Sequence, residues 1–78
     1  MTNLEKYTDA FVSTFDIKPE EAAGLKYQGI EAWDSVGHMG LVAAIEEAFG
    51  IMMEADDIVD LSSFEKGCEI LKKYSIEM

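Results

Sequence analysis

The chain has 78 residues, and its 16 acidic side chains against 6 lysines give a formal net charge of −10 at pH 7. This balance argues against nucleic acids and anionic membranes as partners, because both are bound through clustered lysine and arginine. Disorder is not expected either, since 49% of the residues are hydrophobic and 10% are aromatic.

The length suits one domain, residues 1–78, with a single small core. Such a core leaves little room for a deep catalytic cleft, which favours a binding or carrier module over an enzyme. The single cysteine, Cys68, cannot form an internal disulfide, and the N-terminus has no signal-peptide pattern. No run approaches the roughly 20 apolar residues of a membrane span. A cytoplasmic location is therefore expected.

The first predicted helix covers residues 3–15. Thr2-x-x-Glu5 is typical of a capping box, in which the threonine and glutamate side chains bond each other's backbone N–H groups. Hydrophobic residues then recur at helical spacing, at Leu4, Tyr7, Phe11 and Phe15.

A long first loop covers residues 16–34. Connections of this length are rarely structureless, and Pro19 followed by two acids predicts a short helical turn over 19–22. Four hydrophobic residues are expected to pin the rest of the loop onto the core: Leu25, Tyr27, Ile30 and Trp33.

The second main helix is predicted over residues 35–49, capped by Asp34 or Ser35 and ended by Gly50. A short helix over 56–61, started by Asp56 and Asp57, is expected next. Ser62-x-x-Glu65 predicts a second capping box. Phe64, Cys68, Leu71 and Tyr74 share one face of the helix that follows. The fold class is all-α, with three main helices and one short one.

The outer face of helix 35–49 is unusual for a small bundle. Residues 36–45 carry no formal charge. The inner stripe is formed by Leu41, Val42, Ile45 and Phe49, and the outer face by Val36, Met39, Gly40 and Ala43, followed by Glu46 and Glu47. Either the bundle half-buries this helix on both sides, or its outer face contacts a partner protein.

Charge is unevenly distributed along the chain. No lysine lies between Lys26 and Lys66, while eight acids fall between residues 31 and 60: Glu31, Asp34, Glu46, Glu47, Glu54, Asp56, Asp57 and Asp60. Such a concentration would attract basic protein surfaces and make association depend on salt. The alternative is a face that is merely solvated.

Asp34, Ser35 and His38 do not form a hydrolytic triad by sequence. The Gly-x-Ser-x-Gly pattern is absent, and Asp34 is too close along the chain to orient the only histidine. No metal site is expected, because His38 and Cys68 are 30 residues apart and the acids lack calcium-loop spacing. The chain is therefore not expected to be an enzyme.

One string of residues gives a more specific indication. It comprises Trp33-Asp34-Ser35-Val36, then Leu41-Val42, then Ile45-Glu46-Glu47-x-Phe49 and Ile51. In an acidic chain of this length, this spacing resembles the acyl carrier protein family. The resemblance covers essentially the whole chain and implies that family's four-helix bundle.

The resemblance implies that Ser35 is the attachment site for 4′-phosphopantetheine. A separate phosphopantetheinyl transferase would transfer this group from coenzyme A and supply the metal and base. The arm's thiol, not Cys68, would carry an acyl or aminoacyl group as a thioester. Asp34 precedes the modified serine, as is usual in the family, and His38 lies one turn away, within reach of the arm or its phosphate.

The same resemblance implies a docking surface. Its residues would be Val36, Met39, Ala43, Glu46, Glu47 and Asp56. The implied partners are acyl-activating and acyl-transferring enzymes with basic docking surfaces, and the chain would act as a monomer. Between visits, Ala43, Ala44 and Ala48 would make room for the acyl chain among the helices.

Two glycines depart from the pattern of fatty-acid-synthesis carriers. Gly37 and Gly40 stand two and five positions after the serine, where those carriers have acids. Together with His38, they look more like carriers of dedicated or secondary pathways. The alternative is an unmodified acidic helical module that docks partners through the helix 35–49 face.

Overall fold

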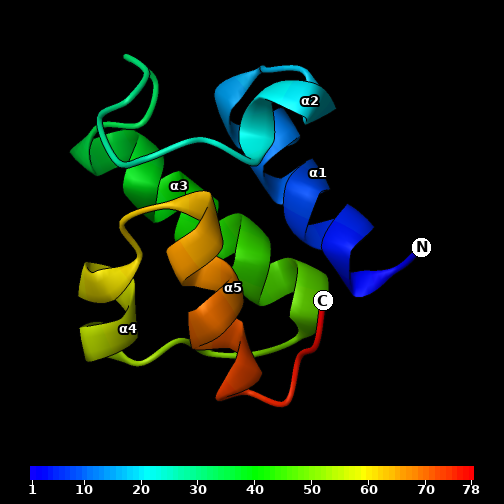
Figure 1. The fold of residues 1–78 in the computed structure, drawn as a ribbon. Coiled ribbons are helices and arrows are strands. Elements are labelled where there is room, and N and C mark those ends of the chain that lie inside the picture. Colours follow the sequence, from blue (N-terminus) through cyan, green and yellow to red (C-terminus); the bar gives the residue numbers. More distant parts are fainter.

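The computed structural model describes residues 1–78 and contains five helices and no strand. They are α1 (Asn3–Phe15), α2 (Pro19–Ala22), α3 (Ser35–Phe49), α4 (Ala55–Asp60) and α5 (Phe64–Lys72), as Figure 1 shows. The predicted all-α class is confirmed. None of these helices combines the length and the apolar character needed to cross a membrane.

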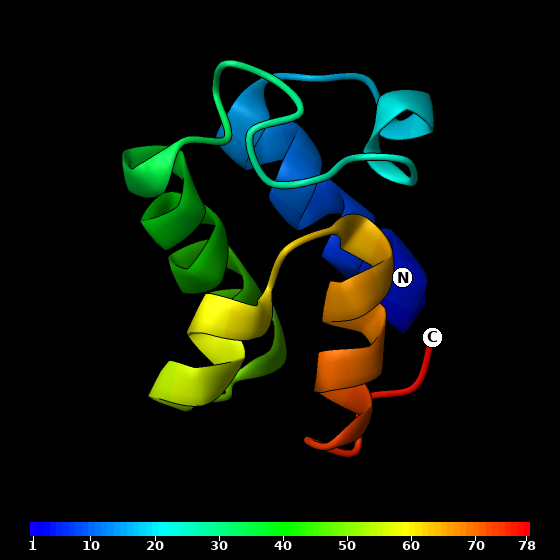
Figure 2. The same cartoon turned by 60° about the vertical axis from the view of Figure 1, so that its left-hand side comes forward.

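Helix α1 begins and ends where the sequence predicts. The Thr2 hydroxyl accepts a hydrogen bond from the Glu5 N–H at 3.1 Å, and the Glu5 carboxylate accepts one from the Thr2 N–H at 2.9 Å. This bonding to Thr2 holds the pKa of Glu5 below its usual value. The other end of the chain returns to this helix, where the Asn3 side chain donates to the Glu77 carbonyl at 3.0 Å. Both termini therefore lie on one side of the molecule (Figures 1 and 2).

The first loop contains the predicted helical turn at Pro19–Ala22, now α2. Trp33 is fully buried, and Leu25 and Ile30 pack against the core, as expected. Tyr27 differs, because its side chain is 36% exposed and lies on the surface beside Trp33 and His38.

The start of α5 corrects the second predicted capping box. The cap is Ser63, whose hydroxyl accepts from the Lys66 N–H at 2.9 Å, and not Ser62. The reason is a short antiparallel bridge between Lys26 and Ser63. It pairs the first loop with the α4–α5 connection and holds Ser63 in an extended conformation, so the helix begins one residue later.

Helix α4 lies beside α3 and α5 (Figure 2). It spans Ala55–Asp60, one residue earlier than predicted, with Glu54 as its cap.

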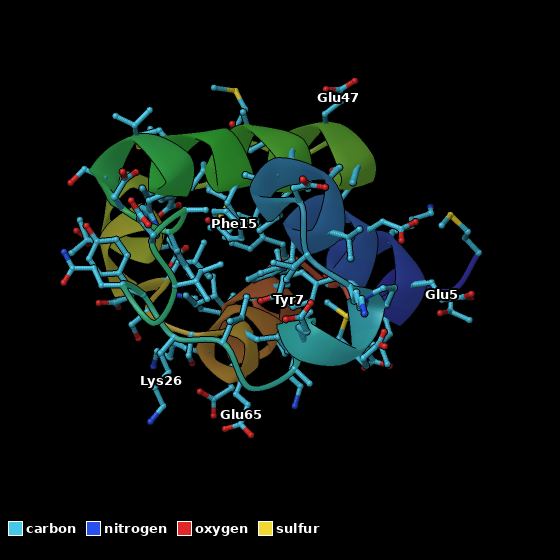
Figure 3. The ribbon with its side chains drawn as sticks, turned by 90° about the horizontal axis from the view of Figure 1, so that it is seen from above. Glu5, Tyr7, Phe15, Lys26, Glu47 and Glu65 are labelled. Carbon is cyan, nitrogen blue, oxygen red and sulfur yellow. The ribbon has the colours of Figure 1, made fainter.

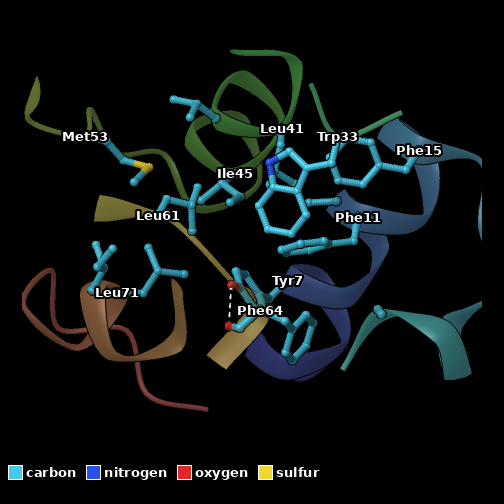
Figure 4. Packing of buried hydrophobic residues seen from close by; sticks show 14 of the residues in the cluster. Tyr7, Phe11, Phe15, Trp33, Leu41, Ile45, Met53, Leu61, Phe64 and Leu71 are labelled. Atoms are coloured by element: carbon cyan, nitrogen blue, oxygen red, sulfur yellow. Dashed lines mark hydrogen bonds between the residues drawn. The ribbon is translucent and has the colours of Figure 1, made fainter. Parts of the chain in front are cut away.

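The core lies between α1, α3 and α5 (Figure 4), and an aromatic cluster forms one part of it beside aliphatic side chains of α3 and α5. Its rings lie 4.7–6.0 Å apart and come from Tyr7, Phe11, Phe15, Trp33 and Phe64. The Tyr7 hydroxyl donates to the Phe64 carbonyl at 2.8 Å, and burial strongly raises the pKa of this phenol. Trp33 extends the cluster to the start of α3, so the core directly supports the residues around Ser35.

Candidate functional site

Ser35 is the first residue of α3, and its side chain is exposed. Asp34 caps the helix, since its Oδ1 accepts from the Gly37 N–H at 2.8 Å. The N–H groups of Ser35 and Val36 have no partner within the helix, because the first turn of any α-helix leaves its N–H groups unpaired. The Ser35 hydroxyl therefore stands at the positive end of a helix of 15 residues.

Gly37 stands where the first loop passes closest to α3. A Cβ atom at this position would collide with the backbone carbonyl oxygen of Ala32. The first loop thus passes against the first turn of α3 so closely that no side chain fits there. Any side chain is therefore sterically excluded at position 37.

His38 connects the first loop to α4 through both ring nitrogens. Its Nδ1 accepts a hydrogen bond from the Trp33 indole N–H at 2.9 Å, and its Nε2 lies 2.7 Å from the Ile58 carbonyl oxygen. Neither nitrogen is left to act as a base toward Ser35. The closest polar side-chain contact of Ser35 is instead the Tyr27 hydroxyl, 3.4 Å away.

A cleft of about 440 Å³ opens beside Ser35, and we name it the Ser35 cleft. It is lined by Tyr27, Ser35, His38, Met39, Ile58, Val59, Leu61 and Ser62. Most of these side chains are apolar, and they come from the first loop, α3, α4 and the α4–α5 connection. Tyr27, Ile58 and Val59 were not among the predicted site residues. The apolar pair Ile58-Val59 within an acidic segment was the available signal for two of them.

The outer face of α3 is open to solvent. Val36 is 82% exposed and Met39 54% exposed, and Gly40 and Ala43 are also exposed. The interpretation that the bundle half-buries this helix on both sides is therefore wrong. Val59 of α4 and Met52 of the α3–α4 connection are exposed too, at 80% and 86%.

The acidic segment is only partly a surface feature. Glu47 and Asp56 are exposed, and Figure 3 shows Glu47 pointing outward from α3. Glu46 is half-buried, and its carboxylate accepts from the Met53 N–H at 2.8 Å, so it also holds the turn after α3.

Asp57 lies in the segment without lysines, yet it has a basic partner from elsewhere in the chain. Its side chain is buried and pairs with the Lys73 ammonium, while the Tyr74 hydroxyl donates to its other oxygen at 2.6 Å. The bonds from Lys73 and Tyr74 hold the pKa of this carboxyl below its usual value. Lys73 lies far along the chain, and the packing of α4 against the end of α5 brings it to the acid.

The three alanines do not line the Ser35 cleft. Ala44 and Ala48 line a second groove between α1 and α3 that is more open to solvent, and Ala43 is exposed. Cys68 is half-buried, and burial is the main reason that its thiol pKa is raised. No three His, Cys, Asp or Glu side chains lie together in a way that could hold a metal ion.

No protein-family model, curated protein or solved structure matches the chain.

Proposed function

We propose that the chain is a carrier of acyl-carrier type, in which Ser35 bears a 4′-phosphopantetheine arm. The arm holds acyl groups as thioesters and presents them to partner enzymes. One observation carries this proposal: an exposed, unactivated serine at the start of α3 borders an apolar cleft. The element order supports the finer fold, with α1, α3, α4 and α5 as the four helices of the family's bundle and α2 as an extra turn in its first loop.

The state of Ser35 fits a modification made by another enzyme. A serine without a positioned base is a weak nucleophile. The transferase would take the proton of the Ser35 hydroxyl while the serine oxygen forms a bond to the phosphorus that bears the pantetheine in coenzyme A. The pyrophosphate bond then breaks, and the nucleotide half of coenzyme A leaves with the other phosphate. The resulting phosphodiester would lie at the positive end of α3, where unpaired N–H groups favour an anion.

The Ser35 cleft supports the next part of the proposal. Its lining is mostly apolar, and Ser35 itself forms part of its wall. An arm attached there can fold back so that the apolar part of its load leaves water. This favours an aliphatic or aromatic acyl group over a charged aminoacyl group as the load.

The outer face of α3 supports delivery to partners. Exposed apolar side chains at Val36 and Met39 are followed along the same helix by the exposed acid Glu47. An apolar centre with a charged rim is typical of transient protein interfaces. Partners with basic docking surfaces complement this rim, and exposed methionine adapts to several of them.

Mass spectrometry tests the modification directly. The chain is incubated with coenzyme A and a broad-specificity phosphopantetheinyl transferase, and it is expected to gain the mass of one arm. Ser35→Ala should abolish the gain, whereas Ser62→Ala, a change at another exposed serine of the same cleft, should leave it intact. A chain that stays unmodified contradicts the proposal, and a gain that survives Ser35→Ala means that the site is misassigned.

A second candidate is an acidic helical module that is never modified and docks partners through the same face of α3. The exposure of Val36 and Met39 favours this candidate, because this face of α3 is accessible to a partner whether or not Ser35 is modified. The mass measurement separates the two candidates. Lack of modification, combined with partner binding that Met39→Lys abolishes, would establish the interaction module.

A further inference from the structure

We propose that His38 is a positioning residue that holds α4 against α3 and thereby sets the shape of the Ser35 cleft. Its ring lies between the Trp33 indole and the Ile58 carbonyl, and both His38 and Ile58 line the cleft. The His38 side chain therefore forms part of the α3 wall of the cleft and also holds the α4 wall, to which Ile58 belongs, in place.

The two hydrogen bonds select one of the two neutral tautomers of the ring. The indole N–H of Trp33 can only donate, so Nδ1 of His38 must accept. The Ile58 carbonyl can only accept, so Nε2 must carry the hydrogen. His38 is thus the neutral Nε2–H tautomer.

Helix α4 depends on such contacts because it has only six residues. A helix this short is not stable by itself. On the side facing α5, buried Asp57 ties it to Lys73 and Tyr74. On the side facing α3, the bond from His38 to Ile58 ties it beside the cleft. Ile58 also packs against the core, so the His38 bond is the polar contact on this side beside an apolar one. Its loss weakens the attachment of α4 to α3, and the helix should then open away from α3 more often.

A matched pair of substitutions separates the two bonds of His38. His38→Gln places an amide N–H near the position of Nε2, so it keeps the bond to Ile58 and loses the acceptor for Trp33. His38→Asn places a carbonyl near the position of Nδ1, so it keeps the acceptor for Trp33 and loses the bond to Ile58. Only His38→Asn should release α4.

Amide hydrogen exchange of the unmodified chain measures this release. In His38→Asn, the amides of Ile58 in α4 and of Leu61 directly after it, which bond the Glu54 and Asp57 carbonyls, should exchange roughly five- to tenfold faster, the factor that one hydrogen bond corresponds to. In His38→Gln they should stay within about twofold of the parent chain. The amides of α1 serve as an internal control and should be unchanged in both variants. Equal acceleration in the two variants, or acceleration of α1 together with α4, would overturn the proposal.

A measurement on the parent chain keeps the proposal testable if His38→Asn does not fold. Ring ¹⁵N chemical shifts distinguish the two neutral tautomers of histidine. The Nε2–H tautomer is expected, and an Nδ1–H tautomer at neutral pH would show that the two bonds are not formed as inferred.

A further consequence, protection of the bound acyl group from water, rests on the proposed function. An octanoyl thioester on the modified chain should hydrolyse faster in His38→Asn than in His38→Gln, because a released α4 exposes the cleft to water. Equal hydrolysis rates would show that His38 does not protect the load. If Ser35 proves not to be modified at all, the carrier proposal fails, while the exchange of the α4 amides still decides the role of His38.

Discussion

The hydroxyl oxygens of Tyr27 and Ser35 lie 3.4 Å apart on the wall of the Ser35 cleft. Tyr27 belongs to the first loop, and its position follows from ring contacts: it meets Trp33 edge-on with centroids 6.2 Å apart and His38 edge-on at 5.4 Å. Packing on the Trp33–His38 pair, together with the bond from the Tyr27 N–H to the Ser62 carbonyl at 2.8 Å, thus places a phenol beside the serine. The long contact between the two hydroxyls has little part in holding Tyr27.

Substitution of Tyr27 separates the ring from the hydroxyl. Tyr27→Phe keeps the edge-on contacts and removes only a long, exposed hydrogen bond, so the free energy of unfolding should change by less than about 0.5 kcal/mol. Tyr27→Ala removes the contacts as well and should cost about 1 kcal/mol more. Urea unfolding followed by the fluorescence of Trp33 measures both. A loss in Tyr27→Phe as large as in Tyr27→Ala would mean that the hydroxyl carries the stability.

Two glycines of α3 should respond oppositely to alanine. In Gly37→Ala the new Cβ meets the Ala32 carbonyl oxygen, and backbone cannot yield cheaply. We expect a loss of about 1–3 kcal/mol, typical of overpacking. In Gly40→Ala the nearest atom is the Thr14 methyl group at 3.5 Å, an ordinary contact. The higher helix propensity of alanine should then stabilise the chain by about 0.5–1 kcal/mol. Thermal and urea unfolding of the two variants test this contrast, and destabilisation of both would contradict it.

The contribution of Asp57 to stability should be lost in acid. Bonds from Lys73 and Tyr74 lower the pKa of this carboxyl in the native chain. The contribution is therefore complete above the unfolded pKa of about 3.9, and it is lost as the pH falls toward the lower native pKa. The pKa of Lys73 is raised, first by its bond to Asp57, so its share is complete below its ordinary value and lost as the pH rises through the native value.

Asp57→Asn is the variant that tests this window. It should be less stable than the parent at neutral pH. The difference should shrink as the pH falls from about 4 toward the lower native pKa, because the parent carboxyl becomes neutral over that range. Urea unfolding midpoints across this range measure the difference. Asp60→Asn, a change at an exposed acid of the same helix, is the control and should show no such convergence. A difference that does not vary with pH would rule out the ion pair as its source.

The features that the sequence predicts correctly are local ones. Helix α1 has a capping box within its first residues, α2 has a proline at its first position, and α3 ends at Gly50 in a left-handed conformation. Each of these features depends on residues within three or four positions of one another, so the local sequence is sufficient to predict it. The outward orientation of Val36 and Met39 follows in the same way from helical periodicity.

The features that were missed depend on contacts between distant segments. Ser63 replaces Ser62 as a cap because of pairing with Lys26, 37 positions earlier. Asp57 is buried because Lys73 and Tyr74 reach it from the end of α5. The contact of His38 with Ile58 spans 20 positions. Sequence periodicity does not indicate such contacts. Candidate residues such as His38 could therefore be predicted from the sequence, but their neighbours in the fold could not.

Substitution of Glu47 should affect docking alone, whereas substitution of Glu46 should affect both docking and folding. Glu47 is exposed, so Glu47→Lys should change the free energy of unfolding by less than about 0.5 kcal/mol, as surface substitutions usually do. If basic partners bind this face, Glu47→Lys should slow modification of Ser35 by the transferase and weaken the dependence of that rate on salt. Glu46→Lys would also remove the acceptor for the Met53 N–H and so mix a folding effect with a docking effect.

Glu46→Gln is the matched control, because it keeps an acceptor for Met53 while it removes the charge. Modification rates at low and high salt, measured for Glu46→Gln and Glu47→Lys beside the parent, separate the contributions. The loss should be larger for Glu47→Lys, since it reverses a charge on the solvent side of the helix. If the parent rate and its salt dependence persist in Glu47→Lys, the acidic end of α3 has no part in recognition, and docking then depends on the apolar residues Val36 and Met39 alone.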